Sequence, residues 1–108
     1  MCEFQSLYFN DDGYVVRCKQ CGVYQVAFIS IMLTLTESDF EAFCKMVKHK
    51  CNEEDCSFIE HTKNVVIPTP CYGIYILLTR VEAQKFNGIL EDADNEAKAL
   101  SMINLFNQ

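Results

Sequence analysis

The stretch VVRCKQCGVYQV most constrains the fold of this chain, because it places a C-x-x-C-G motif between two runs of β-branched and aromatic residues. Runs of this composition favour β-strands. Residues 14–18 and 23–28 are therefore expected to pair as a hairpin, with Cys18 and Cys21 forming a C-x-x-C knuckle at its tip. Two thiolates on one turn can bind the same tetrahedral zinc ion at about 2.3 Å each, and the following glycine lets the chain leave the turn without a Cβ clash.

A second hairpin is predicted upstream, where the strand-like segment FQSLYF at 4–9 runs into the turn formers NDDG. If Phe9 lies opposite Tyr14, antiparallel pairing places Cys2 opposite Cys21. The N-terminal strand would then bring a third thiol to the tip. A register slip of one residue would turn Cys2 to the other face of the sheet.

A first helix is predicted after the strand IMLTLT, because Thr36 and Asp39 resemble a capping box. Apolar side chains then recur at i, i+3, i+4 and i+7, which defines one buried helical face. That face comprises Phe40, Phe43, Cys44 and Val47.

The second half repeats this order of extended segment and helix. Residues 64–67 form an extended arm that PTP ends, because proline cannot donate to a central ladder. A buried strand, YGIYILLT, follows, and Thr79 with Glu82 is expected to cap a second helix. The tail continues helical with an apolar stripe, which packs either in the core or against a second copy of the chain.

The order of these elements predicts where a fourth cysteine lies. The strand before Thr36 returns to the tip, so the first helix begins there and ends about 20 Å away. The extended arm must then come back, and it carries Cys71. We therefore expect a structural zinc site formed by Cys2, Cys18, Cys21 and Cys71, with no open coordination position for a substrate. The alternative is that Cys2 frays with the terminus and Cys71 packs behind the prolines as a buried thiol.

The other cysteines and the two histidines are expected at the opposite end of the molecule or in the core. Cys44 falls on the buried helix face and is assigned to packing. The remaining residues are Cys51, Cys56, His49 and His61, which lie in or beside a polar connector. Their spacing is loose for a metal site, so a solvated loop is the simpler interpretation.

Composition narrows the class of protein. The 108 residues fit one domain, 1–108, and half of them are hydrophobic. No apolar run approaches the ~20 residues of a membrane span, and the N-terminus has no secretion signal, so we expect a cytoplasmic protein. Cysteines in that compartment stay reduced, which disfavours a disulfide framework for the seven present. The net charge of −6 and the lack of a Lys/Arg cluster argue against nucleic-acid binding.

Catalytic motifs are absent from the sequence. It contains no Gly-rich phosphate loop, no H-E-x-x-H and no G-x-S-x-G, so an enzyme is not the favoured interpretation. A redox role for Cys18 and Cys21 is an alternative to metal binding. Thioredoxin-like proteins place C-x-x-C where a strand meets a helix N-terminus, whereas a strand follows the motif here.

The segments DGYVVRCKQCGVYQVAF, LTLTESDFEAF, PTPCYGIYILL and EDADNEAKAL are similar to a family of short bacterial proteins of the Bacteroidetes type, classed as a domain of unknown function. The resemblance spans nearly the whole chain. It implies a small cytoplasmic bacterial protein, and it brings no activity, substrate or site.

These observations predict an α+β domain. An antiparallel sheet would combine a β-meander with a later pair of strands, and two or three helices would cover one face. The expected function is a zinc-stabilised binding or adaptor module that acts through protein contacts, as a homodimer. The alternative is a thiol redox or metal-sensing protein that uses Cys18 and Cys21.

Overall fold

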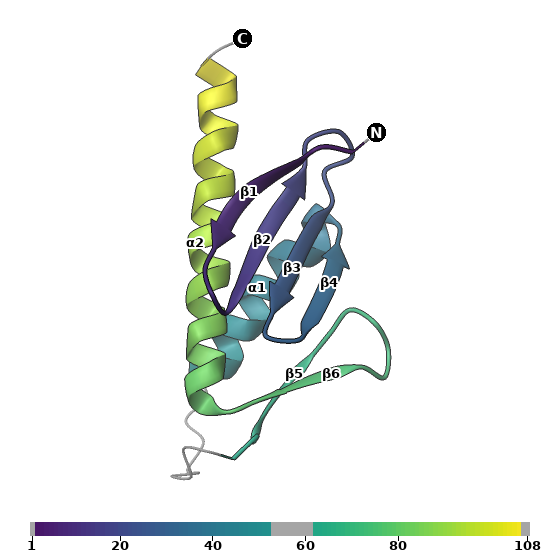
Figure 1. Cartoon of the computed structure of the whole chain (residues 1–108), viewed down its shortest axis with the longest axis vertical. Coiled ribbons are helices and arrows are strands. Elements are labelled where there is room, and N and C mark those ends of the chain that lie inside the picture. The colour runs from purple at the N-terminus through teal and green to yellow at the C-terminus, as the bar shows by residue number, and fades with distance from the viewer. Residues whose placement is uncertain (1, 53–61, 107–108) are drawn as a thin grey trace.

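A computed structural model describes residues 2–52 and 62–106, and its architecture is α+β, as predicted from the sequence (Figure 1). Four strands form an antiparallel sheet in the order β1-β2-β3-β4: β1 (Phe4–Phe9), β2 (Gly13–Cys18), β3 (Tyr24–Phe28) and β4 (Ile31–Leu35). The other elements are α1 (Glu37–Asn52), β5 (Val65–Pro68), β6 (Tyr75–Leu78) and α2 (Arg80–Phe106).

Short turns join the four strands of the meander. The side-chain oxygen of Asn10 accepts hydrogen bonds from the backbone N–H groups of Asp12 and Gly13, which fixes the turn between β1 and β2. Gly13 is needed there, because a Cβ at this position would lie 2.1 Å from the carbonyl oxygen of Ala27 on β3. The predicted turn around Ile29 is confirmed, and that residue has a φ of 56°.

Both helices begin at the predicted threonine caps. The hydroxyl of Thr36 accepts a hydrogen bond from the N–H of Asp39 at 3.1 Å, which caps α1. At α2 the bonds are reciprocal. The N–H of Glu82 donates to the Thr79 hydroxyl, and the N–H of Thr79 donates to the Glu82 carboxylate at 2.9 Å. This is a complete capping box, which satisfies two backbone donors at once.

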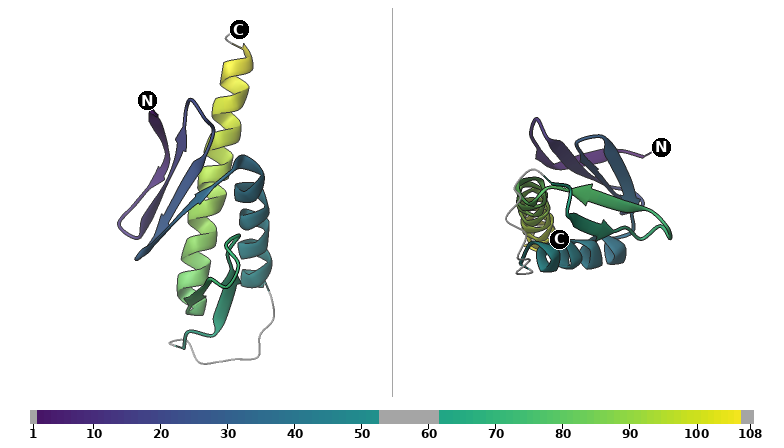
Figure 2. Two further views of the ribbon diagram at one scale, coloured as in Figure 1. Left: turned by 90° about the vertical axis from the view of Figure 1, so that its right-hand side faces the viewer. Right: turned by 90° about the horizontal axis from the view of Figure 1, so that it is seen from below.

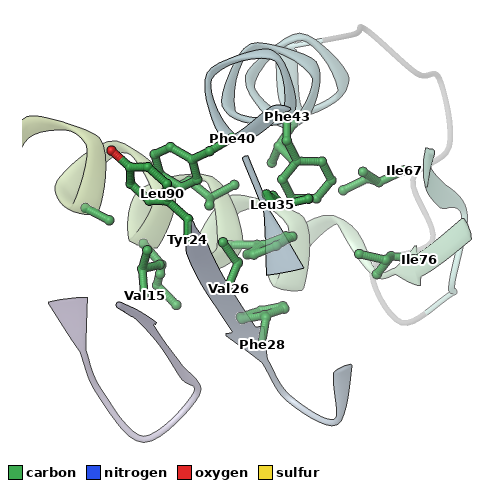
Figure 3. Close-up of a cluster of buried hydrophobic side chains, with 14 of the residues drawn as sticks. Val15, Tyr24, Val26, Phe28, Leu35, Phe40, Phe43, Ile67, Ile76 and Leu90 are labelled. Carbon is green, nitrogen blue, oxygen red and sulfur yellow. The ribbon is translucent and has the colours of Figure 1, made fainter. Parts of the chain in front are cut away.

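The two helices pack side by side on one face of the four-stranded sheet (Figure 2). Helix α2 lies against β1 and β2, and α1 lies against β4 and β5. Aromatic rings form the centre of the core (Figure 3). Tyr24 stacks on Phe40 at 4.2 Å between ring centroids, Phe28 stacks on Phe86 at 4.5 Å, and Phe43 meets the edge of Phe86 at 5.7 Å. The ring of Phe86 thus joins the sheet to both helices.

The later strand pair forms a sheet of its own. Strands β5 and β6 pair with each other, with Ile67 opposite Ile76, and both of these side chains are buried. The pair closes the end of the core beside α1 (Figure 1). The tail after this sheet is one continuous helix, α2, so the described chain has two helices. Neither helix has an apolar stretch long enough to cross a membrane within residues 2–52 and 62–106.

Candidate metal centre

The turn between β2 and β3 carries two of the predicted ligands. Cys18 is the last residue of β2, and its N–H donates to the carbonyl of Val23 at 2.8 Å. The N–H of Gly22 in turn donates to the carbonyl of Cys18 at 3.1 Å. Gly22 has a φ of 77°, which glycine adopts without strain, although a Cβ at this position would meet no other atom within 4 Å.

The N-terminal segment is held against this turn beyond the end of β1. The N–H of Lys19 donates to the carbonyl of Glu3 at 2.8 Å, and the N–H of Glu3 donates to the side-chain oxygen of Gln20 at 2.7 Å. The Lys19 ammonium also pairs with the Glu3 carboxylate at 3.4 Å. These contacts place Cys2 beside the turn. The two residues inside C-x-x-C therefore position the third cysteine, a role that the motif alone did not indicate.

The register of β1 against β2 differs from the predicted one in the N-terminal half of β1. Phe9 lies opposite Tyr14 as expected, but the register shifts between Ser6 and Tyr8, so that Phe4 pairs with Cys18. A β-bulge of this kind adds one residue to a strand without pairing it. Because β1 begins at Phe4, Cys2 lies past the end of the ladder. It still reaches Cys21, because both residues belong to segments outside the regular pairing.

The sulfur atoms of Cys2, Cys18 and Cys21 all lie within 4.8 Å of one another. The Sγ atoms of Cys2 and Cys21 are 3.9 Å apart. Two thiolates bound to one tetrahedral zinc at 2.3 Å would be roughly 3.8 Å apart. Cys18 is buried, whereas Cys2 and Cys21 are exposed. The group therefore has the spacing of a metal site that opens to the surface.

The three thiols differ in their affinity for protons. The backbone N–H of Cys21 donates to Sγ of Cys18 at 3.4 Å and, with the Cys21 side chain, lowers the pKa of Cys18 to about 6. Hydrogen bonds with Cys18 and Cys21, and the charges of those two groups, raise the pKa of Cys2 to about 11. Near neutral pH the group thus holds a thiolate at Cys18 and a thiol at Cys2. Because metals bind thiolates, a metal ion would displace the proton of Cys2.

Cys71 is not part of this group. It is exposed in the turn between β5 and β6, where its N–H donates to the Thr69 hydroxyl at 3.3 Å. The chain does return along α1, but it does not return far enough to reach the other thiols. Strand β5 has four residues and covers roughly 13 Å, whereas the helix has 16 residues and is about 24 Å long. Pro68 at the end of β5 and the following Pro70 lie beside Ala42 and Met46 of α1. The prediction that four cysteines converge therefore holds for three of them, and the fourth lies on the turn of the smaller sheet.

The cysteines of α1 have packing roles. Cys44 packs against the core, and burial raises its pKa to about 12. The thiol of Cys51 donates to the carbonyl of Ala83 at 3.1 Å, which links α1 to α2 and was not predicted. His49 lies on the last turn of α1. The other two members of the loose second cluster, Cys56 and His61, lie outside the described residues.

One known family is similar to the chain. A family model with the description "family of unknown function (DUF6686)" matches residues 1–107. No curated protein and no solved structure matches the chain. The family description gives no activity, ligand or partner, so the geometry of the cysteine group is the guide to function.

Proposed function

The chain belongs to this DUF6686 family of unknown function, and we propose that it is a zinc-stabilised binding module that acts through contacts with other proteins. One observation carries the proposal: the sulfur atoms of Cys2, Cys18 and Cys21, from two separate segments, lie within 4.8 Å of one another. A metal bound there would fix the N-terminal segment to the β2–β3 turn.

Zinc is proposed because of the donor type and the spacing. Thiolates select zinc, Cu(I) and iron–sulfur clusters over hard cations, and zinc needs no redox partner. A reducing compartment would keep the three thiols in the form that binds a metal ion. Three thiolates leave one position of a zinc tetrahedron for a water molecule or another ligand, so the closed four-cysteine site expected from the sequence is not part of this proposal.

Exposed apolar side chains support a role in protein contacts. The smaller sheet and its turn expose Val66, Tyr72, Ile74, Tyr75 and Leu77, and Tyr72 is fully exposed. Val66 and Leu77 lie opposite each other on the two strands, and exposed apolar patches mark sites of interaction. The proposed module would therefore use zinc for its own stability and its surface for its partner.

The test is the metal content of the protein purified under reducing conditions. We expect about one zinc per chain, and a fall in the melting temperature when a chelator removes it, because metal binding is coupled to folding. Cys18→Ser should lose the zinc, since this thiol is buried at the centre of the group. Cys71→Ser is the matched control and should keep it. If the wild-type protein binds no zinc when zinc is added to it, and its melting temperature does not change on that addition, the proposal is wrong.

A thiol redox or metal-sensing role is the second candidate. It was expected to use Cys18 and Cys21, and two observations favour it: the lowered pKa of Cys18 and the 3.9 Å approach of the Cys2 and Cys21 sulfurs. A redox protein should form a reversible disulfide within the group on treatment with oxidised glutathione, which mass spectrometry of peptides detects. It should also contain no metal as purified, in contrast to the zinc-stabilised module.

A further inference from the structure

The last turns of α2 carry apolar side chains that are more than half exposed. Met102 and Ile103 are 58% and 53% exposed, and Leu105 and Phe106 are 70% and 83% exposed. The last buried residue of the helix is Ala97. Figures 1 and 2 show the end of α2 projecting beyond the sheet and beyond α1, along the long axis of a molecule with extents of 51 × 26 × 25 Å.

Two of these side chains, Met102 and Phe106, do not continue the stripe that faces the core. At about 100° per residue, Met102 and Phe106 lie on the opposite side of the helix from the buried residues Phe86, Ala93 and Ala97. With Ala99, they have the spacing of a coiled-coil seam, i, i+3 and i+7. Ala99 is exposed as well. We call Ala99, Met102 and Phe106 the tail seam.

The charge distribution identifies the kind of partner. Residues 99–106 contain no charged side chain, while the chain as a whole carries −6. A membrane surface or a nucleic acid would call for basic residues beside the apolar ones. A second copy of this chain needs none, and the uncharged tail is where two acidic molecules can approach with the least repulsion.

We infer that the tail seam is the contact between two copies of this chain, with the ends of their α2 helices packed antiparallel about a two-fold axis near Met102. In that arrangement Phe106 of one copy lies beside the small Ala99 of the other, and the same contact occurs twice. This inference goes beyond the proposed zinc function and does not depend on it.

The size of the seam sets the strength of the contact. A standard interface buries ~800 Å² on each partner, and the exposed side chains of the last two turns provide less than that. The dimer should therefore be weak, with a Kd on the order of 10 µM or higher. It should form and dissociate readily as the protein concentration changes.

Sedimentation equilibrium of the full chain over about 1–500 µM, a range around that Kd, tests the inference. The wild-type mass should rise from monomer to dimer with concentration. Phe106→Asp should remain monomeric over the whole range, because it places a charge in each of two symmetric contacts. Phe9→Asp is the matched control, since Phe9 is 76% exposed on β1 and lies outside the seam. It should associate like the wild type.

Two results would overturn the inference. One is a wild-type protein that remains monomeric at the highest concentration. The other is a Phe106→Asp protein that dimerises like the wild type. Circular dichroism of each variant separates loss of association from loss of folding, and an exposed position near the end of a helix should leave the spectrum unchanged.

Discussion

At the scale of single residues, the three thiols of the candidate metal centre have unequal roles. Cys18 is buried and accepts a hydrogen bond from the backbone of Cys21, whereas Cys2 is exposed and retains its proton to a higher pH. A metal ion would therefore find one ligand already ionised. Binding would release the proton of Cys2, so zinc affinity should rise with pH above neutrality.

The pKa values also predict how the metal-free protein responds to pH. Folding lowers the pKa of Cys18 from 9.0 to about 6, so its contribution to stability is complete above pH 9 and is lost as the pH falls through 6. Folding raises the pKa of Cys2 from 9.0 to about 11, so that contribution is complete below pH 9 and is lost as the pH rises through 11. The cluster should stabilise the fold most near pH 9.

Thermal melts in the presence of a chelator can measure this effect. The difference in melting temperature between wild type and Cys18→Ser should be larger at about pH 8.5 than at about pH 5, where the thiolate is protonated. Cys71→Ser, whose thiol lies outside the group, should show no such pH dependence. A difference that stays constant between the two pH values would contradict the lowered pKa of Cys18.

At the scale of elements, the sequence predicts the features that are set by residues close together along the chain. The meander, the two threonine caps and the turn at Ile29 follow from local patterns, and all are confirmed. The β-bulge before Tyr8 was not predictable, because no turn residue marks it in the sequence. The prediction that Cys2 and Cys21 converge assumed one register along the whole of β1, whereas the register changes at the bulge.

Two glycines give opposite predictions for the same substitution. Gly13→Ala should destabilise the protein by about 1–3 kcal/mol, because its Cβ would lie 2.1 Å from the backbone oxygen of Ala27. Gly88→Ala should stabilise it by up to about 1 kcal/mol, because this helical position has open space around it and alanine favours helix. Urea unfolding followed by circular dichroism measures both. Equal effects of the two substitutions would refute the close approach of β2 and β3.

At the scale of the whole molecule, long-range placement was the least predictable feature. The position of Cys71 depends on the length of β5 and on the side of α1 along which it returns, and neither is written in the local sequence. The later strands pair with each other and leave β4 at the edge of the larger sheet. Apolar periodicity identifies which residues are buried, but it does not identify the sheet that they join.

Among the core positions, substitution of Phe86 should lower the free energy of unfolding most, because its ring contacts both Phe28 and Phe43. Phe86→Ala should lower the free energy of unfolding by about 3–5 kcal/mol, since it removes a buried aromatic side chain and leaves a cavity. Phe9→Ala, at an exposed position, should change it by less than about 0.5 kcal/mol. Urea midpoints report both values, and a small effect at Phe86 would contradict its central place in the core.

The three thiols of the candidate metal centre all belong to the first 21 residues of the chain. A polypeptide leaving the ribosome would therefore expose every one of these donors before either helix emerges. An ion captured at that moment would close a loop in a chain that has formed only its first turns, and would reduce the conformations open to the remainder. Zinc supply during translation, as well as in the finished protein, would then determine how much of the chain reaches its native state.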